Sequence, residues 1–167
     1  MNHQLASIEK FHRAFGAPVA SEPGIPTPER LALRCKLILE ECMEFLEAAG
    51  FEVLYGGEHM FHQVETADFQ INRKLEDRGG EYVEPSMVGM CDALKDIQVV
   101  TLGTEVEMGL QKISEPMFDE VMASNMSKLD ENGKPIYRED GKILKGLMYF
   151  KPNLKQFLPS TFILGEK

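Results

Sequence analysis

Hydrophobic residues recur along much of the chain at the spacing of amphipathic helices. Leu5, Ile8, Phe11 and Phe15 follow one another at intervals of three and four, which predicts a short helix over residues 4–15. Prolines are then frequent up to residue 28 and predict a loop. Helical spacing returns in three further stretches, which predict helices over residues 28–49, 86–110 and 114–126.

The helix predicted over residues 28–49 has clear start and stop signals. Thr27 is a favourable N-cap, Pro28 suits the first helical position, and Glu29 interacts favourably with the helix dipole. Gly50 is a typical residue just after a helix C-terminus. We therefore expect a helix of about 22 residues, roughly 33 Å long.

The remaining segments are more polar. Residues 58–78 are expected to form a polar helix, and Asp140-Gly141 lies between two short strand-like segments, which predicts a small β-hairpin. Residues 146–167 are expected to form an extended tail. The pattern predicts an all-α protein: an antiparallel bundle of four to five helices with a small C-terminal β-hairpin and an extended tail, in one domain over residues 1–167.

Composition narrows the class of protein. Hydrophobic residues are 43% and charged residues 27% of the chain, which excludes a wholly disordered chain. No apolar run approaches the roughly 18 residues of a membrane helix, and the N-terminus lacks a signal-peptide pattern. We expect a cytoplasmic protein (in the host cytoplasm if the chain is viral) with no membrane partner. The three cysteines form no CxxC pair, so a disulfide scaffold is disfavoured, and we expect Cys35 and Cys42 in the core.

The charge is negative and unevenly distributed. The net charge of −9 argues against a nucleic-acid partner. Residues 1–127 carry a net charge of −12, whereas residues 128–167 carry +3. An acidic body with a basic tail suits a metal-dependent enzyme that acts on an anion, although an ordinary solvated surface accounts for the charge equally well.

Acidic side chains gather on two of the predicted helices. Glu40 and Glu44 share one stripe of the first long helix, with Glu41 beside it, and apolar residues occupy another stripe. Alone, this is typical of a solvent-exposed face. Asp92 and Asp96 share a face of the second long helix with valines and glycines. Because a buried carboxylate is costly unless it is paired or binds a metal, these aspartates need a partner from another element.

A divalent cation shared by the two helices would satisfy both sets of acids. Mg²⁺ prefers oxygen ligands, and two antiparallel helices can supply four or five carboxylates. Clusters of this kind recruit Mg²⁺ or Mn²⁺ to hold phosphates. The alternative is a solvated pair of acids in a loosely packed region. The candidate metal ligands are Glu40, Glu41, Glu44, Asp92 and Asp96.

The two acidic motifs resemble those of a known superfamily. Glu40-Glu41-Cys42-Met43-Glu44 followed by Asp92-Ala93-Leu94-Lys95-Asp96 is similar to the acid pattern of the all-α nucleoside triphosphate pyrophosphohydrolases, which include MazG-like proteins, phosphoribosyl-ATP pyrophosphohydrolases and dimeric dUTPases. The resemblance continues through Thr101–Thr104, Ser124–Lys128 and Asp140–Phe150, and it covers about half the chain.

The resemblance implies an activity and roles for particular residues. The activity is Mg²⁺-dependent cleavage of a (deoxy)nucleoside triphosphate to the monophosphate and pyrophosphate. The five acids would be metal ligands, and Glu41 would also orient or deprotonate the attacking water. The implied partners are the nucleotide and further copies of the chain, as a homodimer or homotetramer. The candidate substrate-binding residues are Asn125, Lys128, Lys142, Lys145 and Tyr149, with Phe150 as an alternative to Tyr149 for stacking on a base.

The chain departs from the superfamily pattern in two places. Gly89 stands where a glutamate usually precedes the first aspartate, so a metal ligand is missing. Residues 51–84 are longer than the usual connection and carry Glu65 and Asp68. These two acids supply the missing carboxylate, form the true acid pair, or belong to a polar helix face. His59 and His62 are expected at the surface. Gly89 also favours a rival function, a helical interaction protein that keeps the fold without catalysis. A nucleotide- or alarmone-binding regulator is a second rival.

Overall fold

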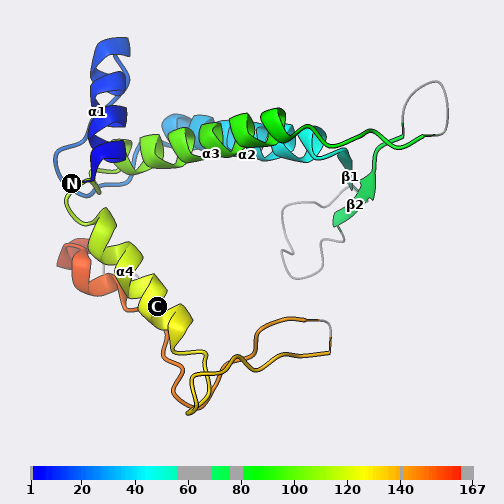
Figure 1. Cartoon of the computed structure of the whole chain (residues 1–167). Helices are drawn as coiled ribbons and strands as arrows, with labels where there is room; N and C mark the ends of the chain where they lie inside the picture. Colours follow the sequence, from blue (N-terminus) through cyan, green and yellow to red (C-terminus); the bar gives the residue numbers. More distant parts are fainter. Residues whose placement is uncertain (1, 56–68, 76–80, 140, 163–167) are drawn as a thin grey trace. The chain divides into compact units, whose positions relative to one another are not determined.

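The computed structural model describes residues 2–55, 69–75, 81–139 and 141–162. Within these ranges the chain forms four α-helices, a two-stranded sheet and two short 3-10 helices (Figure 1). The mostly helical fold predicted from the sequence is confirmed. No helix in the described ranges is both long and apolar enough to cross a membrane. In chain order the elements are α1 (His3–Phe15), α2 (Pro28–Ala48), β1 (Phe51–Tyr55), β2 (Phe69–Arg73), α3 (Met87–Glu107), α4 (Ser114–Met126), η1 (Leu154–Phe157) and η2 (Ser160–Phe162).

The chain divides into two compact units. One unit consists of Met1–Ile25 together with Glu105–Lys167, and the other of Pro26–Thr104. The second unit holds α2, the β1-β2 sheet and most of α3, whereas the first holds α1, α4, the predicted hairpin and the tail. The arrangement in one domain over residues 1–167 stays a prediction.

The ends of α2 follow the signals in the sequence. The Thr27 hydroxyl accepts a hydrogen bond from the backbone N–H of Arg30 at 3.4 Å, and Pro28 begins the helix. The helix ends at Ala48, and Gly50 adopts a left-handed conformation with φ of 78°. A Cβ at residue 50 would lie 2.5 Å from the carbonyl oxygen of Val83. Glycine therefore allows both the turn and the close approach of the chain.

The helices α2 and α3 lie side by side and antiparallel (Figure 1). At one end, Arg34 of α2 donates hydrogen bonds to the Thr104 hydroxyl at 3.0 Å and to the carbonyl of Val100. At the other end, the backbone N–H of Ser86 donates to the carbonyl of Ala48 at 2.7 Å. These contacts at both ends set the register of the helix pair.

A β-hairpin occupies part of the segment for which the sequence suggested a polar helix. β1 pairs antiparallel with β2, in a register that runs from Phe51 opposite Arg73 to Tyr55 opposite Phe69. The helix predicted over residues 58–78 is therefore wrong for residues 69–73, and residues 56–68 and 76–80 lie outside the described part. The sequence FQINR alternates apolar and polar residues with the period of a strand, a signal that the glycine-bounded helix interpretation overlooked.

The first unit has its own small core. Leu5 and Ile8 of α1 are buried, as is Val106 at the end of α3. The loop that follows α1 is tied to this region, because Ala20 donates its N–H to the carbonyl of Val106 at 3.1 Å. The N–H of Gly24 bonds in the same way to the carbonyl of Met108 at 2.9 Å.

The predicted C-terminal hairpin is present. Tyr137 and Ile143 form an antiparallel bridge, and Leu144 donates its N–H to the carbonyl of Ile136 at 2.7 Å. The tail after residue 146 lacks long regular elements and contains only η1 and η2 in the described part. One expectation about the core is wrong: Cys35 is exposed, while Cys42 is half-buried.

Two glycines of the first unit provide a matched test of backbone packing. Gly16 and Gly109 have φ of 69° and 73°, but a Cβ at Gly16 meets nothing within 4 Å, whereas one at Gly109 would overlap the carbonyl oxygen of Glu22. We expect Gly16→Ala to lower the free energy of unfolding by about 1 kcal/mol, and Gly109→Ala to lower it by at least about 1 kcal/mol more. Urea denaturation followed by circular dichroism measures both. Equal losses of unfolding free energy in the two variants would show that the loop at Glu22 moves away from the added methyl group at little cost.

Candidate active site

The antiparallel helix pair brings the two acidic motifs to the same level. Glu40, Glu41 and Glu44 lie on α2, about halfway between Arg34 and Ala48. Asp92 and Asp96 occupy the corresponding part of α3. Glu41 and Asp96 are half-buried, while Glu40, Glu44 and Asp92 are exposed in the single chain.

The pKa of Glu41 reports how closely these acids gather. Partial burial raises the pKa of its carboxyl, and repulsion from the carboxylates of Glu44, Asp96, Glu40 and Asp92 raises it further. Each of the four other candidate ligands therefore acts electrostatically on Glu41. The structure thus places the other four acids singled out in the sequence within electrostatic range of Glu41.

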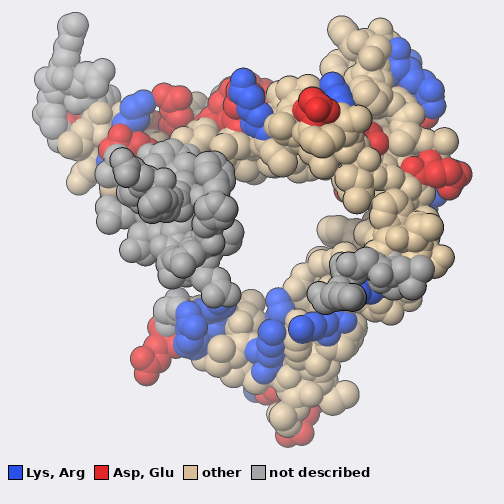
Figure 2. Space-filling view, turned by 180° about the vertical axis from the view of Figure 1, so that it is seen from behind, with Lys and Arg blue, Asp and Glu red and all other residues tan. Residues whose placement is uncertain are grey.

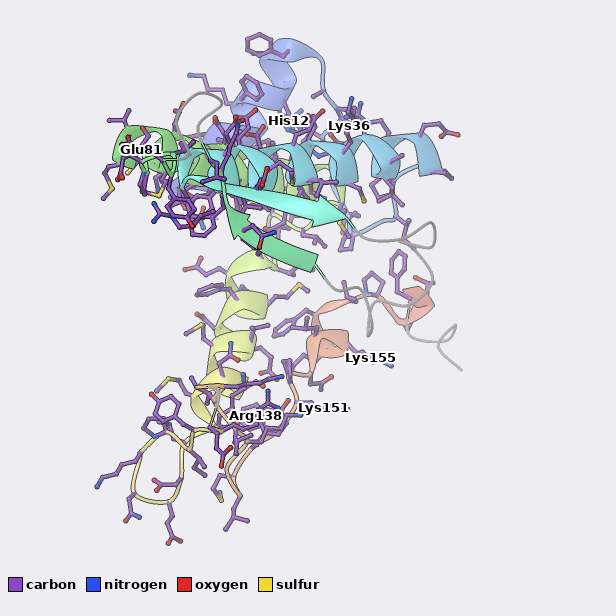
Figure 3. The ribbon with its side chains drawn as sticks, turned by 90° about the vertical axis from the view of Figure 1, so that its right-hand side faces the viewer. His12, Lys36, Glu81, Arg138, Lys151 and Lys155 are labelled. Carbon is purple, nitrogen blue, oxygen red and sulfur yellow. The ribbon has the colours of Figure 1, made fainter. Side chains whose placement is uncertain are left out.

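Among the described residues, Lys36 and Lys74 form ion pairs with glutamates of α2. Lys36, labelled on α2 in Figure 3, forms an ion pair with Glu40 at 3.4 Å, and both side chains are largely solvent-exposed. Lys74 pairs with Glu47 at 2.9 Å, and this hydrogen bond and charge lower the pKa of Glu47. Glu47 and Glu41 lie on the same helix, but their pKa values shift in opposite directions.

The chemistry of the five donors fits a hard divalent cation. Mg²⁺ takes oxygen ligands, keeps several waters and often binds through only one or two carboxylates directly. A cation beside Glu41 would relieve the repulsion that raises its pKa. Within the described ranges, no group of three or more His, Cys, Asp or Glu side chains is arranged to hold a metal ion by itself. The assignment of the metal ligands therefore stays a prediction.

Gly89 lies at a close approach of α2 and α3. A Cβ at this position would lie 3.1 Å from the Cβ of Ala48 and 3.3 Å from the hydroxyl of Ser86. That hydroxyl accepts the N–H of Gly89 at 3.1 Å at the start of α3. A larger side chain would require the neighbouring atoms to move apart by a few tenths of an ångström, so the absent glutamate coincides with tight packing. Glu65, Asp68, His59 and His62 lie outside the described residues.

Four of the five candidate substrate-binding residues form two contacting pairs in the first unit. Lys128 donates to the side-chain oxygen of Asn125 at 2.7 Å, and the ammonium of Lys145 lies 4.5 Å from the centre of the Tyr149 ring. The N–H of Gly146 bonds to the carbonyl of Lys128 at 3.0 Å and so connects the two pairs. The fifth, Lys142, lies in the same hairpin. Figure 2 shows lysine and arginine side chains gathered on the hairpin and tail.

Three side chains that organise these regions were not among the residues expected from the sequence. Arg34 is 7% exposed and joins α2 to α3 through Val100 and Thr104. The signal in the sequence that could have revealed this role is an arginine close to the apolar stripe of the helix predicted over residues 28–49. Ser124 and Ser127 bond to the backbone of Phe150. Their role had no signal in the sequence, because their partner is a main-chain group more than 20 positions away.

Comparison with known proteins identifies the family. No curated protein matches the chain. Among solved structures, a proposed NTP pyrophosphohydrolase from Exiguobacterium sp. 255-15 is 23% identical, covers 98% of this chain and 95% of its own, and has a TM-score of 0.40. The family of phosphoribosyl-ATP pyrophosphohydrolases matches residues 8–125, which is more than half of the chain and includes all five acids. The chain therefore belongs to the phosphoribosyl-ATP pyrophosphohydrolase family.

Proposed function

We propose that the protein is a Mg²⁺-dependent pyrophosphohydrolase that cleaves a (deoxy)nucleoside triphosphate to the monophosphate and pyrophosphate. The observation that carries this proposal is the set of five carboxylates on α2 and α3: partial burial raises the pKa of Glu41, and the four other carboxylates raise it further. Membership of the phosphoribosyl-ATP pyrophosphohydrolase family supports the reaction class. Like charges concentrated at one place in a fold are typical of a functional site.

The five acids would have two roles: all of them would bind the metal, and Glu41 would also accept a proton. Glu40, Glu44, Asp92 and Asp96 would hold Mg²⁺, together with Glu41. When bound, the metal would neutralise triphosphate oxygens and lower the pKa of water. Glu41 would accept a hydrogen bond from the attacking water on a carboxylate oxygen and take up its proton there. Bound Mg²⁺ would relieve the repulsion at Glu41 but not its partial burial, which also raises the pKa of its carboxyl. A carboxylate with a raised pKa is better suited to accept a proton than an ordinary one.

The basic pairs of the first unit would bind the substrate. The ammonium groups of Lys128 and Lys145 suit phosphate oxygens, and Asn125 adds an amide next to Lys128. Lys142 would contribute a further charge, and Tyr149 presents a ring suited to stacking on a base. These assignments rest on side-chain chemistry and on the contacts that group the residues.

The exposed apolar surface of the helices supports assembly into a homodimer or homotetramer. Leu39 is 57% exposed on α2, and Val88 is 81% exposed at the start of α3. Leu33 and Leu94 are exposed on the same two helices. Large apolar side chains repeated along a helix pair are costly to leave in water, and a second copy of the chain would cover them.

A specific observation favours a second candidate function. Gly89 removes a carboxylate that the superfamily pattern usually has, and its close contact with Ala48 leaves little room for one. The alternative is a nucleotide-binding or helical interaction protein of the same fold with weakened catalysis. Such a protein would bind nucleotide without releasing pyrophosphate, or would do neither.

Pyrophosphate release from a panel of canonical and modified dNTPs tests the proposal. We expect monophosphate and pyrophosphate with Mg²⁺, and neither product with EDTA. Glu41→Gln should lower kcat by about 100-fold or more, because the proton acceptor is lost while the shape of the side chain is kept. Glu29→Gln, at the exposed start of the same helix, is the matched control and should keep wild-type turnover.

The outcome also separates the two candidate functions. Folded protein that binds nucleotide but releases no pyrophosphate from any member of the panel would favour the binding protein. Turnover that persists in EDTA, or in Glu41→Gln at the wild-type rate, would contradict the proposed site.

Magnesium should stabilise the fold by binding to the acids. A ligand that binds only the folded state raises the melting temperature as its concentration exceeds its dissociation constant. We expect millimolar Mg²⁺ to raise the melting temperature of the wild type, and to raise it less in Asp92→Asn. Thermal denaturation with and without Mg²⁺ measures the shift. An unchanged melting temperature for the wild type, both alone and with nucleotide, would count against a metal site here.

Without metal, the opposite pKa shifts of Glu41 and Glu47 predict opposite effects on stability. The folded state raises the pKa of Glu41, so this group destabilises the fold increasingly as the pH rises through that pKa. Glu41→Gln should therefore raise the melting temperature in EDTA at pH 7, and the gain should disappear near pH 4. Glu47→Gln should lower it at pH 7, because the lowered pKa reflects a favourable pair with Lys74. A loss in both variants would show that repulsion at Glu41 is negligible.

A further inference from the structure

The segment after the hairpin runs antiparallel along α4. Gly146 bonds through its N–H to the carbonyl of Lys128 at 3.0 Å, just beyond the C-terminal end of the helix. Phe150 contacts Ser124 and Ser127 within the last turn, and Asn153 donates its N–H to the carboxylate of Glu120 at 2.7 Å. Later residues of the segment thus meet earlier residues of the helix. Lys151 and Lys155, labelled in Figure 3, belong to the same stretch.

Two serine hydroxyls satisfy both backbone polar groups of Phe150. Ser124 is 3% exposed and donates to the carbonyl of Phe150 at 2.8 Å. The hydroxyl of Ser127 accepts the N–H of Phe150 at 3.1 Å and donates to the carbonyl of Ser124 at 2.8 Å. The side chain of Phe150 is 44% exposed. The side chain is therefore only partly buried, and the two hydroxyls fix the backbone at this point.

Gly146 provides a second anchor. A Cβ at this residue would overlap the carbonyl oxygen of Leu129 and would lie 2.9 Å from that of Lys128. The backbone can approach the end of α4 this closely only because residue 146 is glycine. Lys145 and Tyr149 lie next to the two anchors along the chain, one before Gly146 and one before Phe150.

We propose that Ser124 and Ser127 are positioning residues of the nucleotide-binding surface. By holding the backbone of Phe150, they fix the Lys145–Tyr149 pair beside Lys128 and Asn125 before the substrate binds. The ligand class is an anion with an aromatic ring, and the inference rests on the proposed function, which makes that ligand a nucleoside triphosphate. A surface ordered in advance avoids the loss of conformational entropy that a free tail would undergo on binding.

Ser127 is the better of the two serines to substitute, because it is only half-buried and its loss disturbs the packing less than loss of the buried Ser124. We expect Ser127→Ala to raise KM for the preferred nucleotide by roughly threefold to tenfold, the effect of one hydrogen bond, and to change kcat by less than about twofold. Ser127→Thr keeps the hydroxyl and should restore KM. Gly146→Ala should raise KM through the other anchor. Ser7→Ala is the matched control, because it removes an exposed hydroxyl that bonds to the carbonyl of His3 in α1.

Two measurements that need no turnover complete the test. Titration calorimetry with a nucleotide analogue that resists cleavage between its α- and β-phosphates, in Mg²⁺, should show weaker binding by Ser127→Ala in proportion to its KM. Amide hydrogen exchange should show that the N–H of Phe150 is protected in the wild type and in Ser127→Thr, and exchanges faster in Ser127→Ala. A KM effect with restored affinity in Ser127→Thr would support positioning rather than a general loss of stability.

The outcomes distinguish this inference from the proposed function. If the wild type binds the analogue but cleaves no nucleotide, the proposed reaction fails, and calorimetry alone still tests the serines. If turnover is normal and both Ser127→Ala and Gly146→Ala keep the wild-type KM and affinity, the positioning role is overturned while the reaction stands. Absence of nucleotide binding by the wild type would overturn both.

Discussion

The antiparallel pairing of α2 and α3 is the constraint on which the candidate active site depends. Arg34 joins the helices at one end through Val100 and Thr104. Gly89 and Ser86 meet Ala48 at the other end. The contacts at both ends fix the register of the two helices. A shift of one helical turn would move the α3 acids about 5.4 Å from the level of Glu41. The position of the acids is therefore set by residues that carry no carboxylate.

This arrangement opposes the stability of the unit that contains it. Partial burial raises the pKa of Glu41 and the neighbouring carboxylates raise it further, so the folded chain holds like charges near one another. The local packing around the acids is modest, since Asp92 is exposed and large apolar residues such as Val88 remain in contact with solvent. The proposed cation at the acids and the proposed second copy over the apolar surface would each stabilise the folded chain by binding to it.

The helical part of the fold could be predicted because its signals are local. Thr27 and Pro28 mark the start of α2, and apolar spacing marks α1, α3 and α4. The acids could be predicted because helical periodicity places residues four apart on one face. The strand over residues 69–73 was missed although its alternation was visible, because a short polar segment between glycines satisfies more than one pattern.

Other features could not be predicted because they depend on contacts between distant positions. Gly89 suggested a missing ligand, but only the packing against Ala48 shows why a larger residue fits poorly. Ser124 and Ser127 have no side-chain partner that a pattern could reveal, since they bond to the backbone of Phe150. Residues 128–167 carry eight Lys and Arg residues against five acids, and the segment is held to the end of α4 through the backbone of Gly146 and Phe150. Because these contacts use main-chain groups of the segment, they fix its path without engaging the side chains of Lys145 and Tyr149.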